Sequence, residues 1–167
     1  MATIYSFITE EQATLIESSH VFFVASAEPG LRDGPNGVGP VSVSPRGGVP
    51  LHILDRNRVA FLDYAGSGNE TARHSGAGGS VTIMVCSFEA DDAAIVRLYG
   101  KARVVPLEDS AIAGPLLERQ ADDIALPARQ IVEVDVERTS TSCGYGVPVM
   151  PFVRDRSRSD RGRRYKE

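Results

Sequence analysis

Two stretches in the first half of the chain place hydroxyl, amide and charged side chains among glycines, a pattern that could bind a phosphate or a planar ligand. Residues 42–48 read Ser-Val-Ser-Pro-Arg-Gly-Gly, and residues 66–71 read Gly-Ser-Gly-Asn-Glu-Thr. Small residues in a turn leave backbone N–H groups uncovered, and such groups bind anions. These two stretches are therefore the first candidates for a binding site.

The stretch 66–71 matches neither of the common nucleotide-binding motifs. It lacks the GK[ST] of a phosphate-binding P-loop, and its last residue is Thr71 where a dinucleotide fingerprint needs Gly. As a phosphate site it would offer Ser67, Asn69, Thr71 and backbone amides at a helix N-terminus. As a plain strand-to-helix connection it would use Asn or Ser as a helix cap. Both interpretations stay open at this point.

The stretch 42–48 overlaps a short predicted strand, 41–44, which Pro45 is expected to end and which has one polar face. Ser42 and Ser44 lie two residues apart and so share a face, and Arg46 adds a fixed positive charge beside two glycines. A planar ligand with hydrogen-bonding groups could lie along this face. The alternative is an edge strand whose polar face is in water.

Two later segments hold weaker candidates. One face of the passage 95–105 carries Arg97, Tyr99, Lys101 and Arg103, which we interpret as a solvated outer face that could also meet a ligand or a partner subunit. Near the C-terminus, Cys143-Gly144-Tyr145-Gly146 bends the backbone and presents Tyr145, as in a docking segment. A thiol nucleophile at Cys143 is disfavoured, because nothing in the sequence places a base beside it.

Charge is distributed unevenly along the 167 residues, which carry a formal net charge of −4. Residues 154–167 hold seven Lys or Arg and three Asp or Glu, a balance of +4. The preceding 153 residues hold eleven Lys or Arg and nineteen Asp or Glu, a balance of −8. We predict one domain over 1–153 and a basic, disordered tail over 154–167, which has almost no apolar content. Nucleic-acid binding is disfavoured, because the acidic domain repels phosphate.

The cysteine, histidine and hydropathy patterns argue against a disulfide-rich, membrane-spanning, secreted or metal-binding protein. Two cysteines make no disulfide framework, so a cytoplasmic location is expected. No apolar run approaches the ~20 residues that span a bilayer, and the first residues lack the layout of a signal peptide. The chain has no CxxC or HExxH, so no metal site is expected. Its three histidines are scattered: His20, His52 and His74.

The elements that must position these candidates are mostly strands. Thr9 to Gln12 reads as a capping box that opens a short helix, and 109–121 predicts a second helix that Pro115 kinks or starts. A long loop, 28–40, is a candidate for a mobile segment that covers a site. Without a repeated strand–helix–strand unit, six or seven strands favour an antiparallel barrel with short helices. The predicted strands are 20–28, 41–44, 51–54, 58–64, 80–88, 95–105 and 130–138.

Taken together, these segments resemble the pyridoxamine 5'-phosphate oxidase-like family of FMN-binding split-barrel flavoproteins. The resemblance rests on VSPRGG at 43–48, LDYAGSGNET at 62–71 and SCGYGVP at 142–148, and it covers about residues 4–153. It implies a mainly β fold, a six-stranded antiparallel Greek-key split barrel. It also implies a homodimer that holds two FMN molecules at its subunit interface.

The resemblance further implies where the cofactor binds. The strand 41–46 would line the isoalloxazine ring, and the turn 67–71 would hold the 5′-phosphate. Arg46 would stabilise the negative charge that the reduced flavin carries. The expected cofactor-binding residues are Val43, Ser44, Arg46, Gly47, Ser67, Gly68, Asn69 and Thr71.

The chain also departs from this family's pattern. The vitamin B6 oxidases hold phosphate with an Arg-Lys pair where this chain has Gly68-Asn69-Glu70, so pyridoxamine phosphate is a poor candidate substrate. We therefore expect an FMN-dependent oxidoreductase that acts on an unidentified small molecule. The alternative is a noncatalytic module that binds flavin, deazaflavin or haem. No side chain stands out as a catalytic acid or base, although Tyr64, Tyr99, Tyr145 and His74 are possible proton donors.

Overall fold

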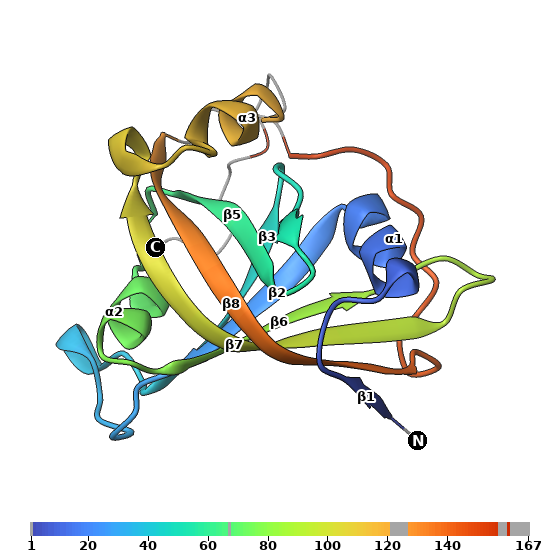
Figure 1. Ribbon diagram of the computed structural model, residues 1–167, viewed down its shortest axis with the longest axis horizontal. Coiled ribbons are helices and arrows are strands. Elements are labelled where there is room, and N and C mark those ends of the chain that lie inside the picture. Colours follow the sequence, from blue (N-terminus) through green and yellow to red (C-terminus); the bar gives the residue numbers. More distant parts are fainter. Residues whose placement is uncertain (1, 67, 121–126, 157–159, 161–167) are drawn as a thin grey trace.

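The computed structural model describes residues 2–66, 68–120, 127–156 and 160, and these form an antiparallel sheet that curls around a core (Figure 1). The sheet has eight strands in the order β3-β2-β6-β7-β8-β5-β4, with β1 paired to β8. The strands are β1 (Thr3–Tyr5), β2 (Val21–Ala27), β3 (Val41–Gly47), β4 (His52–Asp55), β5 (Arg58–Tyr64), β6 (Ser80–Cys86), β7 (Ala94–Pro106) and β8 (Ala128–Cys143). The helices are α1 (Glu10–Ser18), α2 (Glu70–Gly76) and α3 (Ala113–Glu118), with 3₁₀ turns η1 (Pro35–Gly37) and η2 (Leu107–Asp109).

The barrel class expected from the sequence is confirmed, with eight strands where the segments predicted six or seven and the resemblance implied six. All seven predicted strands are present, and the additional strand is β1, which is only three residues long. The prediction that Pro45 ends its strand at residue 44 is wrong, because β3 continues to Gly47. β3 is an edge strand, where a missing N–H group breaks no ladder, so proline is tolerated there.

Alternating apolar residues fill the inside of the barrel. In β5, Val59 and Phe61 face the main core, while Ala60 and Leu62 face a second cluster beneath α3. β5 is therefore buried on both faces. The main core is completed by side chains from β2, β6, β7, β8 and α1, among them Phe22, Val24, Ile83, Leu98, Val134 and Ile16.

Several local predictions are confirmed. Thr9 and Gln12 form the capping box: the Gln12 N–H donates to Thr9 Oγ1 at 3.2 Å, and the Thr9 N–H donates to Gln12 Oε1 at 3.1 Å. Pro115 lies in the first turn of α3, so it marks the start of that helix. Among the described residues no helix is long and apolar enough to cross a membrane.

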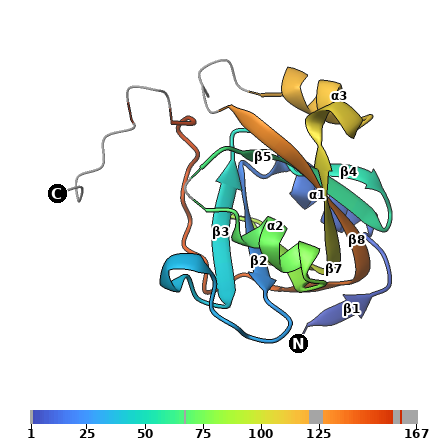
Figure 2. The ribbon, with the colours of Figure 1, turned by 90° about the vertical axis from the view of Figure 1, so that its left-hand side faces the viewer.

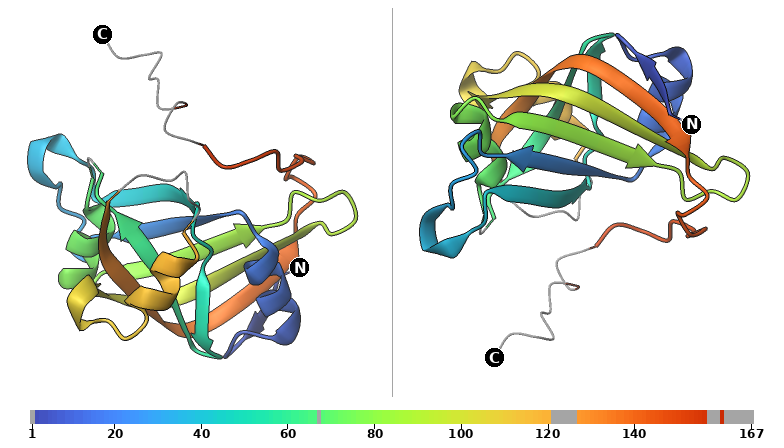
Figure 3. Two further views of the ribbon diagram at one scale, coloured as in Figure 1. Left: turned by 90° about the horizontal axis from the view of Figure 1, so that it is seen from above. Right: turned by 90° about the horizontal axis from the view of Figure 1, so that it is seen from below.

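After β8 the chain returns along the outside of the barrel. Residues 144–156, which we call the C-terminal strap, run upward beside the β6–β7 hairpin and α1 (Figure 1). Seen from above and below, the strap leaves the end of β8 and runs along the outside of the barrel toward β3 (Figure 3). Most of the basic tail beyond it, residues 157–159 and 161–167, lies outside the described residues.

Candidate functional site

A single ion pair connects two strands that the sheet order keeps apart. β3 is one edge of the sheet, whereas β5 lies near the other edge. Arg46 of β3 donates from Nη1 to Oδ1 of Asp63 of β5 at 2.5 Å, and its guanidinium lies 5.7 Å from the centre of the Phe61 ring. The pair therefore bridges the open seam of the barrel between β3 and β5.

Asp63 lies at the buried centre of this site. It continues the row of Val59 and Phe61 toward the inside of the barrel and is only 2% exposed. A buried carboxylate is costly unless charged partners compensate it. The partners here come from β8, the neighbour of β5, as well as from β3.

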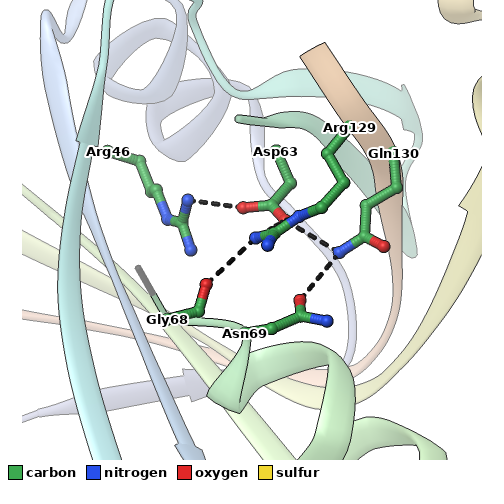
Figure 4. A network of polar contacts seen from close by, with 6 residues as sticks. All are labelled: Arg46, Asp63, Gly68, Asn69, Arg129 and Gln130. Carbon is green, nitrogen blue, oxygen red and sulfur yellow. Dashed lines mark hydrogen bonds and ion pairs between the residues drawn. The ribbon is translucent and has the colours of Figure 1, made fainter. Parts of the chain in front are cut away.

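Two β8 residues complete the cluster (Figure 4). Arg129 donates to Asp63 Oδ2 at 2.8 Å through Nη2, and Gln130 donates to the same oxygen at 2.8 Å. The same two side chains reach the turn before α2, where Arg129 donates to the Gly68 carbonyl and Gln130 donates to Asn69 Oδ1, both at 3.1 Å. β8 thus ties the turn to the buried carboxylate.

The turn before α2 is held by this cluster rather than by a helix cap. Asn69 is the N-cap residue of α2, but its side chain makes no capping hydrogen bond. Its side-chain oxygen accepts from Gln130 instead. The interpretation of Asn69 as a capping side chain is therefore wrong.

The other end of α2 is anchored by a buried histidine. His74 is fully buried, and its ring lies 2.9 Å from Ser26 Oγ at Nδ1 and 3.1 Å from Arg73 Nη2 at Nε2. A guanidinium can only donate, so Nε2 accepts and Nδ1 carries the proton that is donated to Ser26. This contact joins the last turn of α2 to β2.

A cavity of about 490 Å³ lies next to the cluster, a size typical of small-molecule sites. Figure 2 shows the neighbouring elements β3, β2 and α2 on one side of the molecule. Two buried polar atoms on the inward face of β3, Ser44 Oγ and Arg46 Nε, have no hydrogen-bond partner within the described part of the chain. Such atoms are costly unless a ligand or water binds them. The cavity is lined by Val21, Phe22, Pro45, Arg46, Gly47, Gly48, Val49, Leu62, Tyr64, Ala65, Gly66, Asp155 and Arg156.

Tyr64 and the end of the C-terminal strap form one side of this cavity. Burial and the nearby carboxylate of Asp155 raise the pKa of the Tyr64 phenol above its ordinary value. The phenol therefore keeps its proton at neutral pH and can serve as a hydrogen-bond donor. Tyr99, another proton-donor candidate, lies on β7 with its hydroxyl 3.2 Å from Ser140 Oγ.

The structure brings most of the predicted site residues to this region. Ser44 and Arg46 face inward, Gly47 lines the cavity, and Gly68 and Asn69 contact the β8 side chains. The remaining three predicted residues are placed as follows: Thr71 is buried in the first turn of α2, Val43 is 65% exposed on the opposite face of β3, and Ser67 lies outside the described residues.

Sequence reasoning missed Asp63, Arg129 and Gln130. A signal for Asp63 existed, since a carboxylate inside the apolar passage 59–64 needs a charged partner. Nothing in the sequence pairs it with residues more than sixty positions away. In the described ranges, no group of three His, Cys, Asp or Glu side chains could hold a metal ion.

Comparison with known proteins places residues 8–143 in one family. They match the family model described as pyridoxamine 5'-phosphate oxidase. The chain is 33% identical over 138 residues to the pyridoxamine 5'-phosphate oxidase family protein ustO of Aspergillus flavus. The match covers 81% of this chain and 51% of that protein, so the chain spans about half the length of this curated relative.

Solved structures share the fold at low sequence identity. HupZ of Group A Streptococcus superposes with a TM-score of 0.57 at 17% identity, over 79% of this chain and 91% of the other. An FMN-binding protein of Syntrophomonas wolfei superposes with a TM-score of 0.54 at 9% identity, over 77% and 86%. At these identities the likeness shows the fold alone.

Proposed function

Because the chain belongs to the pyridoxamine 5'-phosphate oxidase family, we propose that it is an FMN-dependent oxidoreductase that acts on a small molecule and holds FMN at a homodimer interface. The observation that carries this proposal is the cluster of Arg46, Asp63 and Arg129 beside a cavity that Arg46 lines, with buried polar atoms of Arg46 and of its β3 neighbour Ser44 left without a partner in the described part of the chain. FMN, when bound, supplies reversible electron transfer, and the protein supplies orientation and electrostatics.

The cluster has the charge that an anionic cofactor requires. Its two guanidiniums outweigh the single carboxylate of Asp63 and leave a net charge of +1. Asp63 holds both arginines in place, since each donates to a different oxygen of the carboxylate. The ring of the cofactor would lie along Ser44 and Arg46, whose Oγ and Nε atoms are available for hydrogen bonds.

Arg129 supplies the positive charge that the turn 66–71 itself lacks. The turn 66–71 lacks the basic pair by which vitamin B6 oxidases hold phosphate, yet the Arg129 guanidinium lies 3.1 Å from the Gly68 carbonyl of that turn. Positive charge is therefore present at the turn, supplied by β8. We propose that Arg129 and the turn together bind the 5′-phosphate.

The outer face of β3 supports the homodimer. Val41 and Val43 are 58% and 65% exposed, while the serines and Arg46 between them face inward. An edge strand that exposes its apolar side and buries its polar side is what a second copy would cover. We propose that this face lies at or near the subunit interface.

The decisive experiment compares FMN with riboflavin, which lacks the phosphate. We expect the wild-type protein to bind both, and Arg129→Met to weaken FMN binding by about 10- to 100-fold, because charge-assisted hydrogen bonds contribute about 1.5–3 kcal/mol. Riboflavin binding should change little. Arg103→Met is the matched control, since that arginine is 61% exposed on the outside of the barrel.

Flavin fluorescence quenching and the mass of the released cofactor give the readout. A protein that binds neither flavin would refute the proposal. An unchanged ratio of FMN to riboflavin affinity in Arg129→Met would place the phosphate elsewhere. Oxidoreductase activity requires in addition that the bound flavin be reduced by a donor such as NAD(P)H and reoxidised by an acceptor.

A noncatalytic module is the second candidate. This candidate is favoured by the hydrogen bonds of Asp63. Both oxygens of its carboxylate already accept hydrogen bonds from Arg46, Arg129 and Gln130, so the carboxylate is not available as a catalytic acid or base. Bound flavin that no donor reduces would support this function. Among the described side chains that line the cavity there is no His, Cys or Met, so a haem there would depend on Tyr64 as its ligand.

A further inference from the structure

A second cavity, of about 370 Å³, lies under the C-terminal strap and apart from the one beside Asp63. We call it the strap cavity. It is bounded by the end of α1, the start of β2, the β6–β7 hairpin and the strap, which run close together in Figure 1. Among its lining residues are Leu15, His20, Cys86, Phe88, Glu89, Asp92, Met150, Phe152 and Arg154.

The walls of the strap cavity are aromatic and aliphatic. The His20 and Phe152 rings stack with their centroids 3.6 Å apart and their planes 5° from parallel. Leu15, Phe88 and Met150 add apolar surface. Flat aromatic surfaces of this kind favour a planar ring as the ligand.

The thiol of Cys86 adds no charge to these walls. The residue is only 6% exposed, and burial raises the pKa of its thiol above the ordinary value. At neutral pH it therefore behaves as a small apolar group. The charge of the cavity is set by its rim instead.

Two carboxylates form the rim. Glu89 and Asp92 lie in the loop between β6 and β7, and both are exposed. The positive residue that lines the cavity, Arg154, is paired with Asp160 at 2.5 Å. The rim is thus acidic, in a domain whose residues 1–153 carry a balance of −8, and it favours a cation.

We propose that the strap cavity is a second small-molecule site, which binds a planar aromatic cation with its ring against the apolar walls and its positive charge toward Glu89 and Asp92. The strap that roofs this cavity continues to Asp155 and Arg156, which line the cavity beside Arg46. The strap cavity and the cavity beside Arg46 are therefore both lined by residues of the C-terminal strap. The proposal does not depend on FMN binding.

Three indole compounds that differ in charge test this proposal: tryptamine, neutral tryptophol and anionic indole-3-propionate, each titrated into the whole protein by calorimetry. We expect tryptamine to bind about three- to tenfold more tightly than indole-3-propionate, from two exposed charge pairs. Exchanging both rim acids in Glu89→Gln/Asp92→Asn should abolish this preference. Asp91→Asn, in the same loop but outside the lining, should retain it.

A second arm tests the aromatic wall. His20→Ala should weaken tryptamine binding about two- to tenfold, as loss of an aromatic pair does, whereas Tyr145→Ala, at an 87% exposed strap residue, should not. Absence of tryptamine binding, or an unchanged charge preference in the rim variant, would overturn the proposal. So would competition by FMN, because the ligand would then occupy the cavity beside Arg46. A protein that binds tryptamine but no flavin would refute the proposed function alone.

Discussion

Replacing Asp63 by Asn is the most direct test of the seam between β3 and β5. The change keeps the size of the side chain and removes its charge. In the native protein Arg46, Arg129 and Gln130 donate to the carboxylate at 2.5, 2.8 and 2.8 Å. An amide has only one acceptor oxygen, and its NH₂ group would face a guanidinium that cannot accept a hydrogen bond.

The expected loss follows from burial. Removing one partner of a fully buried ion pair costs about 3–5 kcal/mol. The Arg46 and Arg129 side chains are 22% and 25% exposed, so water solvates them in part. We therefore expect the free energy of unfolding to fall by about 2–3 kcal/mol. In a domain of this size each kcal/mol lowers Tm by about 2–4 °C, which predicts a decrease of about 4–12 °C.

Urea unfolding followed by circular dichroism measures this loss, and calorimetry measures the shift in Tm. Asp55→Asn is the matched control. Asp55 pairs with Arg58 at 2.7 Å with both side chains 47% exposed, and an Asn there keeps the oxygen that accepts from the Asn57 N–H. Exposed pairs contribute about 0–1 kcal/mol. If Asp63→Asn loses no more stability than Asp55→Asn, the seam is not held by this carboxylate.

Three further perturbations test other parts of the structure. Val43→Lys should weaken self-association about tenfold or more, measured by sedimentation, because it places charge on the exposed apolar face of β3. Gly100→Ala should cost about 2–3 kcal/mol of unfolding free energy, since a Cβ there would overlap a backbone carbonyl of β8. Hydrogen bonds from Arg32 lower the pKa of Glu28 to about 2, so the stability that this contact gives is present above pH 4.5 and is lost as the pH falls toward 2. In Arg32→Ala the pKa of Glu28, followed by NMR, should return toward 4.5.

Each of these has an outcome that contradicts it. An unchanged association state in Val43→Lys would remove β3 from the interface. Gly114→Ala is the control for Gly100→Ala, because nothing lies within 4 Å of a Cβ at Gly114, and equal stability of the two variants would exclude the overlap. A Glu28 carboxyl that still titrates near 2 in Arg32→Ala would have another cause for its shift.

Much of the fold was predictable because its signals are local. The alternation of apolar and polar residues in β7 and β8 reflects which side chains face the core. The capping box needs only Thr9 and Gln12. The hairpin between β4 and β5 follows from the turn residues 55–57. β1 was missed, since three residues are too few to show a period. The end of β3 was predicted wrongly at Pro45, because a proline interrupts an inner strand but is tolerated in an edge strand. Which strand lies at the edge depends on the order of strands in the sheet, and no local sequence pattern shows it.

The sequence by itself determined seven of the eight described strands, the family resemblance and two of the segments that meet at the candidate site, because side-chain periodicity and turn chemistry act between near neighbours. Only the tertiary structure decided that Arg129 and Gln130 reach Asp63 and the turn before α2, and that β3 turns its serines and Arg46 inward and its valines outward. These features depend on the order of strands in the sheet. That order brings together residues more than sixty positions apart, and a buried carboxylate then selects the partners that can neutralise it.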